Sequence, residues 1–143
     1  MKYQKSSHAT YDLRYHIVWI TKYRRPVLNK EIISRLEEII PITCKDIWVV
    51  ILKMWFEEDH VHMYIRMQPT KSISSVIWHI KWKSAYIIRK EFYKYLKKYY
   101  WGSSHLWAIW YFSASVWEIN WEIIAKYVES QWKEENEVIE VEL

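Results

Sequence analysis

Two histidines with one residue between them form the clearest chemical motif of the chain, in the segment Asp59-His60-Val61-His62. On a β-strand, alternate side chains face the same side, so both imidazoles would lie on one face of a sheet, about 6.5–7 Å apart at the backbone. This spacing lets a ring nitrogen of each histidine reach one cation, while Val61 points the other way, into the core. The pair alone is a weak indication of a metal site, because His-x-His also arises often by chance.

A tyrosine and an amide are spaced for one helical face near the end of the chain. Tyr127 and Gln131 are four residues apart, so on a helix they lie one turn apart, about 6 Å along the axis. Packing explains such a pair as readily as chemistry does, since Tyr127 also completes an apolar stripe. The other members of that stripe are Ile123, Ile124, Val128 and Trp132.

Basic residues are unevenly distributed. Residues 1–100 carry a net charge of +10 and residues 101–143 a net charge of −6. Basic side chains interleaved with aromatic ones suit a nucleic acid, because its phosphates pair with the charges and its bases stack on the rings. A solvated helix face would give the same pattern. The candidate DNA-binding residues are Lys22, Arg24, Arg25, Lys81, Lys83, Arg89 and Lys90.

Four strands and three helices are predicted to position these side chains. Alternating, branched and aromatic residues predict strands over 12–21, 47–56, 60–67 and 106–116. Asn29, Ser72 and Asn120 can each cap a helix. Pro41 should end or bend the first helix. The second should reach residue 86 or 90, with a further segment over 91–99, and the last should cover 121–135.

This element order defines a fold class. The pattern β-α-β-β-α-β, followed by a helix that carries Tyr127, predicts an α+β protein of the ferredoxin-like, split βαβ type. Such a fold has an antiparallel four-stranded sheet with helices on one face. Its open face is a common place to receive single-stranded nucleic acid.

Size and composition narrow the class of protein. The chain has 143 residues, 51% hydrophobic and 27% charged, as expected for a single globular domain over 1–143. Gly102 is the only glycine, so turns must rely on other residues, and Cys44 is the only cysteine, which excludes an internal disulfide. The longest apolar run, 106–112, is too short to span a membrane, and the polar start shows no secretory signal. We therefore expect a cytoplasmic protein with no membrane partner.

Taken together, six segments resemble the small single-tyrosine HUH transposases of bacterial and archaeal insertion sequences, the insertion sequence 200 family of the transposase A type. The resemblance rests on their order and on the matching elements that carry His-hydrophobic-His and Tyr…Gln. It covers a core of about 11–132 and leaves an acidic tail, 133–143, unexplained. The segments are 11–19, 22–27, 59–62, 81–89, 110–112 and 126–131.

The resemblance implies an enzyme, a DNA transposase that cleaves and joins single strands at hairpin-marked element ends through a 5′-phosphotyrosine. By position, Tyr127 would be the nucleophile. His60, His62 and Gln131 would hold a divalent metal ion, Mg²⁺ or Mn²⁺. Asp59 would orient one of these ligands without contacting the metal itself. The implied partners are single-stranded DNA with hairpins and a second copy of the chain, in a homodimer whose active sites draw on both subunits.

Two alternatives stay open at this stage. One is a catalytically inactive ferredoxin-like nucleic-acid-binding protein derived from such a transposase, and the other is a metal-binding interaction module. The chain also departs from the family where relatives tend to carry glycine, because it has Trp82 in the basic helix and Trp117 before the tyrosine helix. That departure bears on the mobility of the helix rather than on the cleavage residues.

Overall fold

The computed structural model describes residues 3–101, 105–115 and 129. Four antiparallel strands form the main sheet in the spatial order β4-β5-β3-β6. Their bounds are Leu13–Thr21 for β3, Val50–Phe56 for β4, His60–Met67 for β5 and Trp107–Ser115 for β6. This order, with one crossover helix after β3 and another after β5, is the predicted ferredoxin-like arrangement. The helix predicted over 121–135 and the acidic tail lie outside the described residues, apart from Glu129.

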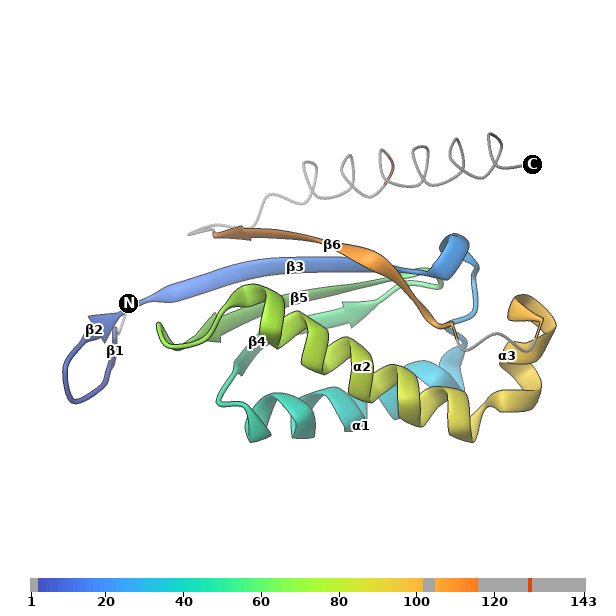
Figure 1. Cartoon of the computed structure of the whole chain (residues 1–143), viewed down its shortest axis with the longest axis horizontal. Helices are drawn as coiled ribbons and strands as arrows, with labels where there is room; N and C mark the ends of the chain where they lie inside the picture. The colour runs from blue at the N-terminus through green and yellow to red at the C-terminus, as the bar shows by residue number, and fades with distance from the viewer. Residues whose placement is uncertain (1–2, 102–104, 116–128, 130–143) are drawn as a thin grey trace.

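Two long helices cover one face of the sheet, α1 (Lys30–Asp46) and α2 (Ile73–Glu91), as Figure 1 shows. The core fills the space between the helices and this face. From the strands it takes every second residue, such as Ile17 and Trp19 of β3 and Val61 and Met63 of β5, all at most 1% exposed. Each such burial stabilises the fold by about 1.5–3 kcal/mol. The residues between them therefore face the other side of the sheet.

The helix starts agree with the sequence prediction. The Asn29 side chain accepts a hydrogen bond from the Ile32 amide at 2.9 Å, and the Ser72 hydroxyl accepts one from the Ser75 amide at 3.2 Å. These bonds satisfy amides that have no partner within the helix. A cap worth about 1 kcal/mol thus fixes where each helix begins.

Pro41 does not end α1, which was one of the two outcomes expected there. The helix continues to Asp46 with Pro41 inside it. A proline inside a helix costs about 3 kcal/mol, because its ring crowds the preceding turn and it donates no hydrogen bond. Burial of the residues on both sides offsets that cost, since Ile40, Thr43 and Cys44 are each at most 1% exposed.

Other boundaries moved by one to three residues. The strand predicted from residue 47 begins at Val50, and it is an edge strand rather than a buried one, with Val50 46% and Leu52 39% exposed. The predicted break after α2 is confirmed, because α3 (Tyr93–Tyr100) follows it directly. A small N-terminal hairpin, β1 (Gln4–Lys5) paired with β2 (Thr10–Tyr11), was not predicted.

The shortage of glycine has a visible structural result. Within the described residues, four that are not glycine take left-handed backbone conformations: Tyr23, Arg24, Trp48 and Trp101, with φ between 50° and 59°. An L-residue in this region costs roughly 1–2 kcal/mol, and glycine would avoid that cost. Tyr23 and Arg24 belong to the 3₁₀ turn η1 (Lys22–Arg24), which directly follows β3.

Among the helices that the structure describes, none combines the length and the hydropathy needed to cross a bilayer.

Candidate active site

His60 and His62 lie on the face of the sheet that α1 and α2 leave uncovered. The residues that alternate with them on β5, Val61 and Met63, are fully buried on the helix side. The two imidazole rings are 4.8 Å apart between centroids, with 73° between their planes. The sequence prediction of one shared face is thereby confirmed.

Asp59 fixes the orientation and the tautomer of His60. Its Oδ1 atom lies 2.6 Å from Nδ1 of His60, and its backbone carbonyl accepts a hydrogen bond from the Thr21 amide at 2.9 Å. Burial would raise the pKa of Asp59, but the hydrogen bond with His60 and the charge of Arg24 outweigh burial and lower that pKa. An ionised carboxylate only accepts hydrogen bonds, so the proton sits on Nδ1 and leaves Nε2 of His60 as the atom able to bind a metal.

The imidazole of His62 is shielded from water. Its ring stacks on the indole of Trp55 from the neighbouring strand, with 4.5 Å between centroids and 13° between planes, and the residue is 8% exposed. Burial first, and then the nearby His60 and His16, lower the pKa of His62 to about 4. The imidazole is therefore neutral near pH 7, which is the form that a metal ion requires.

These two rings fit a shared divalent cation. Two imidazoles that bind one metal through nitrogen have centroids at most about 6.5 Å apart, and 4.8 Å lies within that limit. Within the described ranges no group of three or more His, Cys, Asp or Glu side chains could hold a metal. A two-histidine site needs a further ligand, and the predicted one, Gln131, lies outside the described residues. So does the predicted nucleophile, Tyr127.

Arg24 is the side chain at this candidate site whose contacts sequence reasoning missed. It was grouped with the DNA-binding residues, but in the structure its Nε atom donates to Asp59 Oδ2 at 2.8 Å and its Nη2 atom to Glu129 Oε1 at 3.0 Å. Burial would lower the pKa of Arg24, and the bonds with Glu129 and Asp59 raise it instead. The sequence offered one indication, an acidic residue, Glu129, two positions after Tyr127.

The other predicted DNA-binding residues differ in their surroundings. Arg25 and Lys90 are exposed, while Lys22 places its ammonium 5.0 Å from the centre of the Tyr23 ring. Lys83 lies 3.9 Å from a carboxylate oxygen of Asp46. Arg89 is half-buried on α2. Which of them contact DNA stays a prediction.

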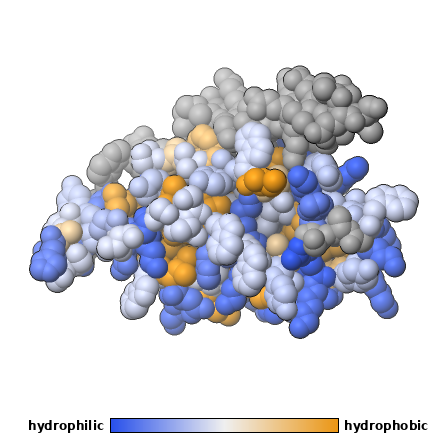
Figure 2. Space-filling model, in the orientation of Figure 1, coloured by the Kyte–Doolittle hydropathy of each residue, from blue (hydrophilic) through white to orange (hydrophobic). Residues whose placement is uncertain are grey.

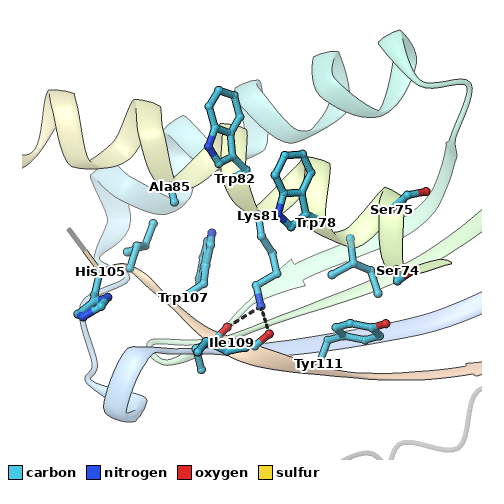
Figure 3. Close-up of a pocket in the computed structure, with 13 residues that line it drawn as sticks. Ser74, Ser75, Trp78, Lys81, Trp82, Ala85, His105, Trp107, Ile109 and Tyr111 are labelled. Atoms are coloured by element: carbon cyan, nitrogen blue, oxygen red, sulfur yellow. Dashed lines mark hydrogen bonds between the residues drawn. The ribbon is translucent and has the colours of Figure 1, made fainter. Parts of the chain in front are cut away.

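Lys81 closes one side of a groove between α2 and β6 (Figure 3). Its ammonium donates to the carbonyl of Ala108 at 2.5 Å and lies 3.3 Å from that of Ile109. Burial, together with the charge of Lys22, lowers the pKa of Lys81 to about 8. A lysine held in this way is less available to a phosphate than the prediction assumed.

Exposed aromatic rings line the same helix. Trp78, Trp82 and Tyr86 follow at helical spacing, with neighbouring ring planes within 15° and centroids 6.2 and 5.9 Å apart. They are 65%, 55% and 51% exposed, so none of the three rings packs into the core of this chain. Figure 3 shows both indoles side by side above the groove, which has a volume of about 740 Å³. On the face shown in Figure 2, strongly hydrophobic side chains form small separate patches.

The sequence matches known transposases. It is 31% identical over 137 residues to the ISDra2 transposase TnpA of Deinococcus radiodurans, covering 94% of this chain and 95% of that protein. It is 30% identical over 99 residues to the transposase for insertion sequence element IS200 of Salmonella typhimurium, covering 66% of this chain and 65% of that protein.

Solved structures agree with the sequence matches. A candidate transposase from Deinococcus radiodurans superposes with a TM-score of 0.81 at 29% identity, over 90% of this chain and 97% of that one. A REP-associated tyrosine transposase bound to a REP hairpin shares the fold, with a TM-score of 0.56 at 14% identity, over 80% of this chain and 64% of that one. The family model for IS200-like transposases matches residues 9–131. The chain therefore belongs to the IS200-like family of transposases, the enzymes that cleave and transfer DNA in transposition.

Proposed function

We propose that this transposase cleaves and rejoins single-stranded DNA with Tyr127 as nucleophile and with a divalent metal, Mg²⁺ or Mn²⁺, held by His60, His62 and Gln131. The observation that carries this proposal is the paired imidazoles of β5, one with its tautomer fixed by Asp59 and the other kept neutral by burial. A fixed tautomer at His60 and a neutral ring at His62 are what metal binding requires, and a purely structural pair would need neither.

The proposed reaction has two steps, and Tyr127 takes part in both. The phenol oxygen of Tyr127 attacks a backbone phosphorus and releases its proton to solvent, the bond from phosphorus to the 3′ oxygen breaks, and that oxygen takes up a proton from solvent. The strand is released as a 3′-hydroxyl and the other side stays on the protein as a 5′-phosphotyrosine. A later 3′-hydroxyl attacks that linkage, restores the phenol and joins two strands without ATP. A divalent metal held by His60, His62 and Gln131 would supply positive charge to the phosphate oxygens.

We also propose that the DNA partner carries hairpins. The solved neighbour that is bound to a REP hairpin has the same fold, and the basic residues of this chain are concentrated in its first hundred positions. Arg25 and Lys90 are exposed and so can offer charge to a DNA backbone. The role of Lys81 in that contact is weakened by its bonds to β6.

A second copy of the chain is the proposed protein partner. Edge strand β6 and the groove beside it expose apolar side chains that a monomer leaves in water, among them Ile109 at 86% and Trp78 at 65%. Sedimentation velocity tests this surface: Ile109→Asp should shift a dimer toward monomer. Ile42→Asp is the matched control, because Ile42 is 62% exposed on α1, away from the groove.

The decisive experiment looks for the covalent intermediate. The full chain is incubated with Mn²⁺ and an end-labelled single strand that carries a hairpin, and products are separated under denaturing conditions. We expect a protein–DNA adduct that Tyr127→Phe abolishes, with hairpin binding unchanged within a few-fold. An undiminished adduct in this variant would move the nucleophile elsewhere, with Tyr111 as the next candidate. Hairpin binding with no adduct in the unmodified protein would establish the inactive binding protein instead.

A further inference from the structure

A single arginine connects the metal-ligand side of the site to the chain beside Tyr127. Arg24 donates from Nε to Asp59 and from Nη2 to Glu129, at 2.8 and 3.0 Å. The same Asp59 accepts from His60 through its other oxygen, at 2.6 Å. Glu129 stands two positions after Tyr127 in the sequence. The contacts therefore run without a break from Glu129 to the ring of His60.

The turn that carries Arg24 is held in an unusual shape. Tyr23 and Arg24 are consecutive non-glycine residues with φ of 56° and 50°. Several bonds hold the turn: the Thr21 hydroxyl donates to the Arg25 carbonyl at 2.7 Å, the Lys22 amide donates to the Leu106 carbonyl at 2.8 Å, and the Tyr100 hydroxyl donates to the Lys22 carbonyl at 2.9 Å. Left-handed backbone in such residues persists only where surrounding contacts enforce it, and it concentrates at functional sites.

The two carboxylates that Arg24 contacts differ in their solvent exposure. The Asp59 side chain is 24% exposed and its backbone is bonded to β3, whereas the Glu129 side chain is 61% exposed. Arg24, at 14%, is the most buried of the three. The guanidinium and Asp59 are thus the more buried part of this contact, and Glu129 is its more exposed partner.

We propose that Arg24 is a positioning residue that docks the Tyr127 segment, through Glu129, onto the carboxylate that orients His60. The proposal rests on the proposed function for the roles of Tyr127 and His60. When Glu129 docks, the charge of Arg24 is shared between two carboxylates. The position of the Tyr127 segment and the orientation of His60 then depend on the same side chain. An arginine is required, because its planar fork serves two acceptors from different nitrogens at once.

A double-mutant cycle tests this connection without using activity. Arg24→Gln, Glu129→Gln and the double variant are compared with the unmodified chain by amide hydrogen exchange of the peptide that contains Glu129, with metal and DNA absent. We expect exchange about fivefold faster in Glu129→Gln, the size of a partly exposed ion pair. The double variant should exchange no faster than Arg24→Gln alone.

A matched control comes from a similar ion pair elsewhere. Arg35 of α1 bonds both oxygens of Glu91 at 2.8 and 2.9 Å, well outside the site. Glu91→Gln removes one carboxylate charge of the same type and should leave exchange at Glu129 unchanged. Arg24→Lys keeps the positive charge but removes the planar guanidinium. We expect it to recover less than half of the protection from exchange that Arg24→Gln loses, because one ammonium cannot replace the fork.

A second readout ties the docking to the reaction. With saturating hairpin DNA and Mn²⁺, Glu129→Gln should slow adduct formation about fivefold with DNA affinity unchanged. Unchanged exchange in Glu129→Gln, or effects of the two substitutions that simply add, would overturn the docking role even if adducts form normally. Coupled exchange in a chain that forms no adduct would uphold the docking contact and overturn the proposed function.

Discussion

Trp55 lies flat against His62, with ring centroids 4.5 Å apart and 13° between the planes, on directly paired positions of β4 and β5. The indole is thus part of what keeps water from the imidazole, whose pKa is lowered to about 4. In the metal-free protein, Trp55→Ala should raise the pKa of His62 toward 6.5. An NMR titration of the imidazole signals measures this, with Trp55→Phe as the control that keeps a ring in place. An equal pKa in all three proteins would mean that Trp55 does not shield His62.

The same shift makes stability depend on pH. Between pH 4 and 6.5 the unfolded chain protonates His62 and the folded chain does not, so the free energy of unfolding falls as the pH is lowered through that interval. Above pH 6.5 this contribution is fully present. Denaturant midpoints measured at pH 7 and at pH 5 should differ less in His62→Gln than in the unmodified chain.

Metal binding should depend on each imidazole. His60→Ala and His62→Ala should each lose measurable Mn²⁺ binding, because a site with three protein ligands holds a hard cation poorly once one is gone. Gln131→Ala should be milder, since water replaces an amide oxygen. Calorimetry measures all three, with His79→Ala on α2 as the histidine control. Unchanged Mn²⁺ affinity in both β5 variants would remove the shared-ligand assignment.

DNA affinity should depend on salt. If about five basic side chains contact phosphates, log affinity should fall against log salt concentration with a slope near −3.5 on a single strand, or near −4.5 on a duplex stem. Arg25→Glu and Lys90→Glu should each flatten this slope. Lys5→Glu on β1 changes the net charge equally and should leave it unaltered. A slope near zero for the unmodified chain would exclude backbone recognition altogether.

Lys81 should give stability a dependence on alkaline pH. Its pKa in the folded chain is about 8, against 10.5 for an ordinary lysine, so between these values the unfolded chain binds the additional proton. The free energy of unfolding should therefore rise with pH from 8 to 10.5 and stay level below 8. Lys81→Met should remove that rise, while Lys83→Met on the same helix should keep it. Parallel pH profiles for the first variant and the unmodified chain would contradict the burial of the ammonium.

A glycine at Trp48 should stabilise the protein. Trp48 has φ of 59° just after the end of α1 and is 71% exposed, so its side chain contributes little packing. Trp48→Gly should raise the free energy of unfolding by about 0.5–1 kcal/mol, because glycine takes this conformation without the Cβ clash. Urea unfolding measures the gain, and Trp48→Ala is the control that keeps a Cβ. Equal stability of the two variants would show that the backbone there is unstrained.

The fold could be predicted from the sequence because its signals are local and repeated. Alternation along β3, the His-x-His spacing of β5 and the caps Asn29 and Ser72 each specify structure within a few residues. The end of α1 escaped prediction, because a buried face that includes Cys44 overrides a proline, and burial is a property of the whole core. The exposure of Trp78, at 65%, could not be predicted either, since hydrophobicity alone does not tell a packed ring from an exposed one.

The site was predictable only in part. His60 and His62 belong to one strand, so their juxtaposition follows from a period of two. Arg24 meets Asp59 across 35 positions and Glu129 across 105, and it does so from a turn whose left-handed backbone no composition rule indicates. Charge alone placed Arg24 with the DNA-binding residues. Whether an arginine is available to DNA or is paired with a carboxylate of the protein depends on the three-dimensional structure.

Cys44 has a practical consequence for watching this molecule work. It is the only thiol in the chain, it is 1% exposed, and burial raises its pKa to about 12. Maleimide dyes react with thiolates, so the folded protein should stay unlabelled at neutral pH. Any cysteine introduced on the surface then becomes the sole dye attachment point, with no need to remove the native one. A donor beside Lys90 and an acceptor on the DNA would report single encounters by energy transfer from an otherwise unaltered transposase.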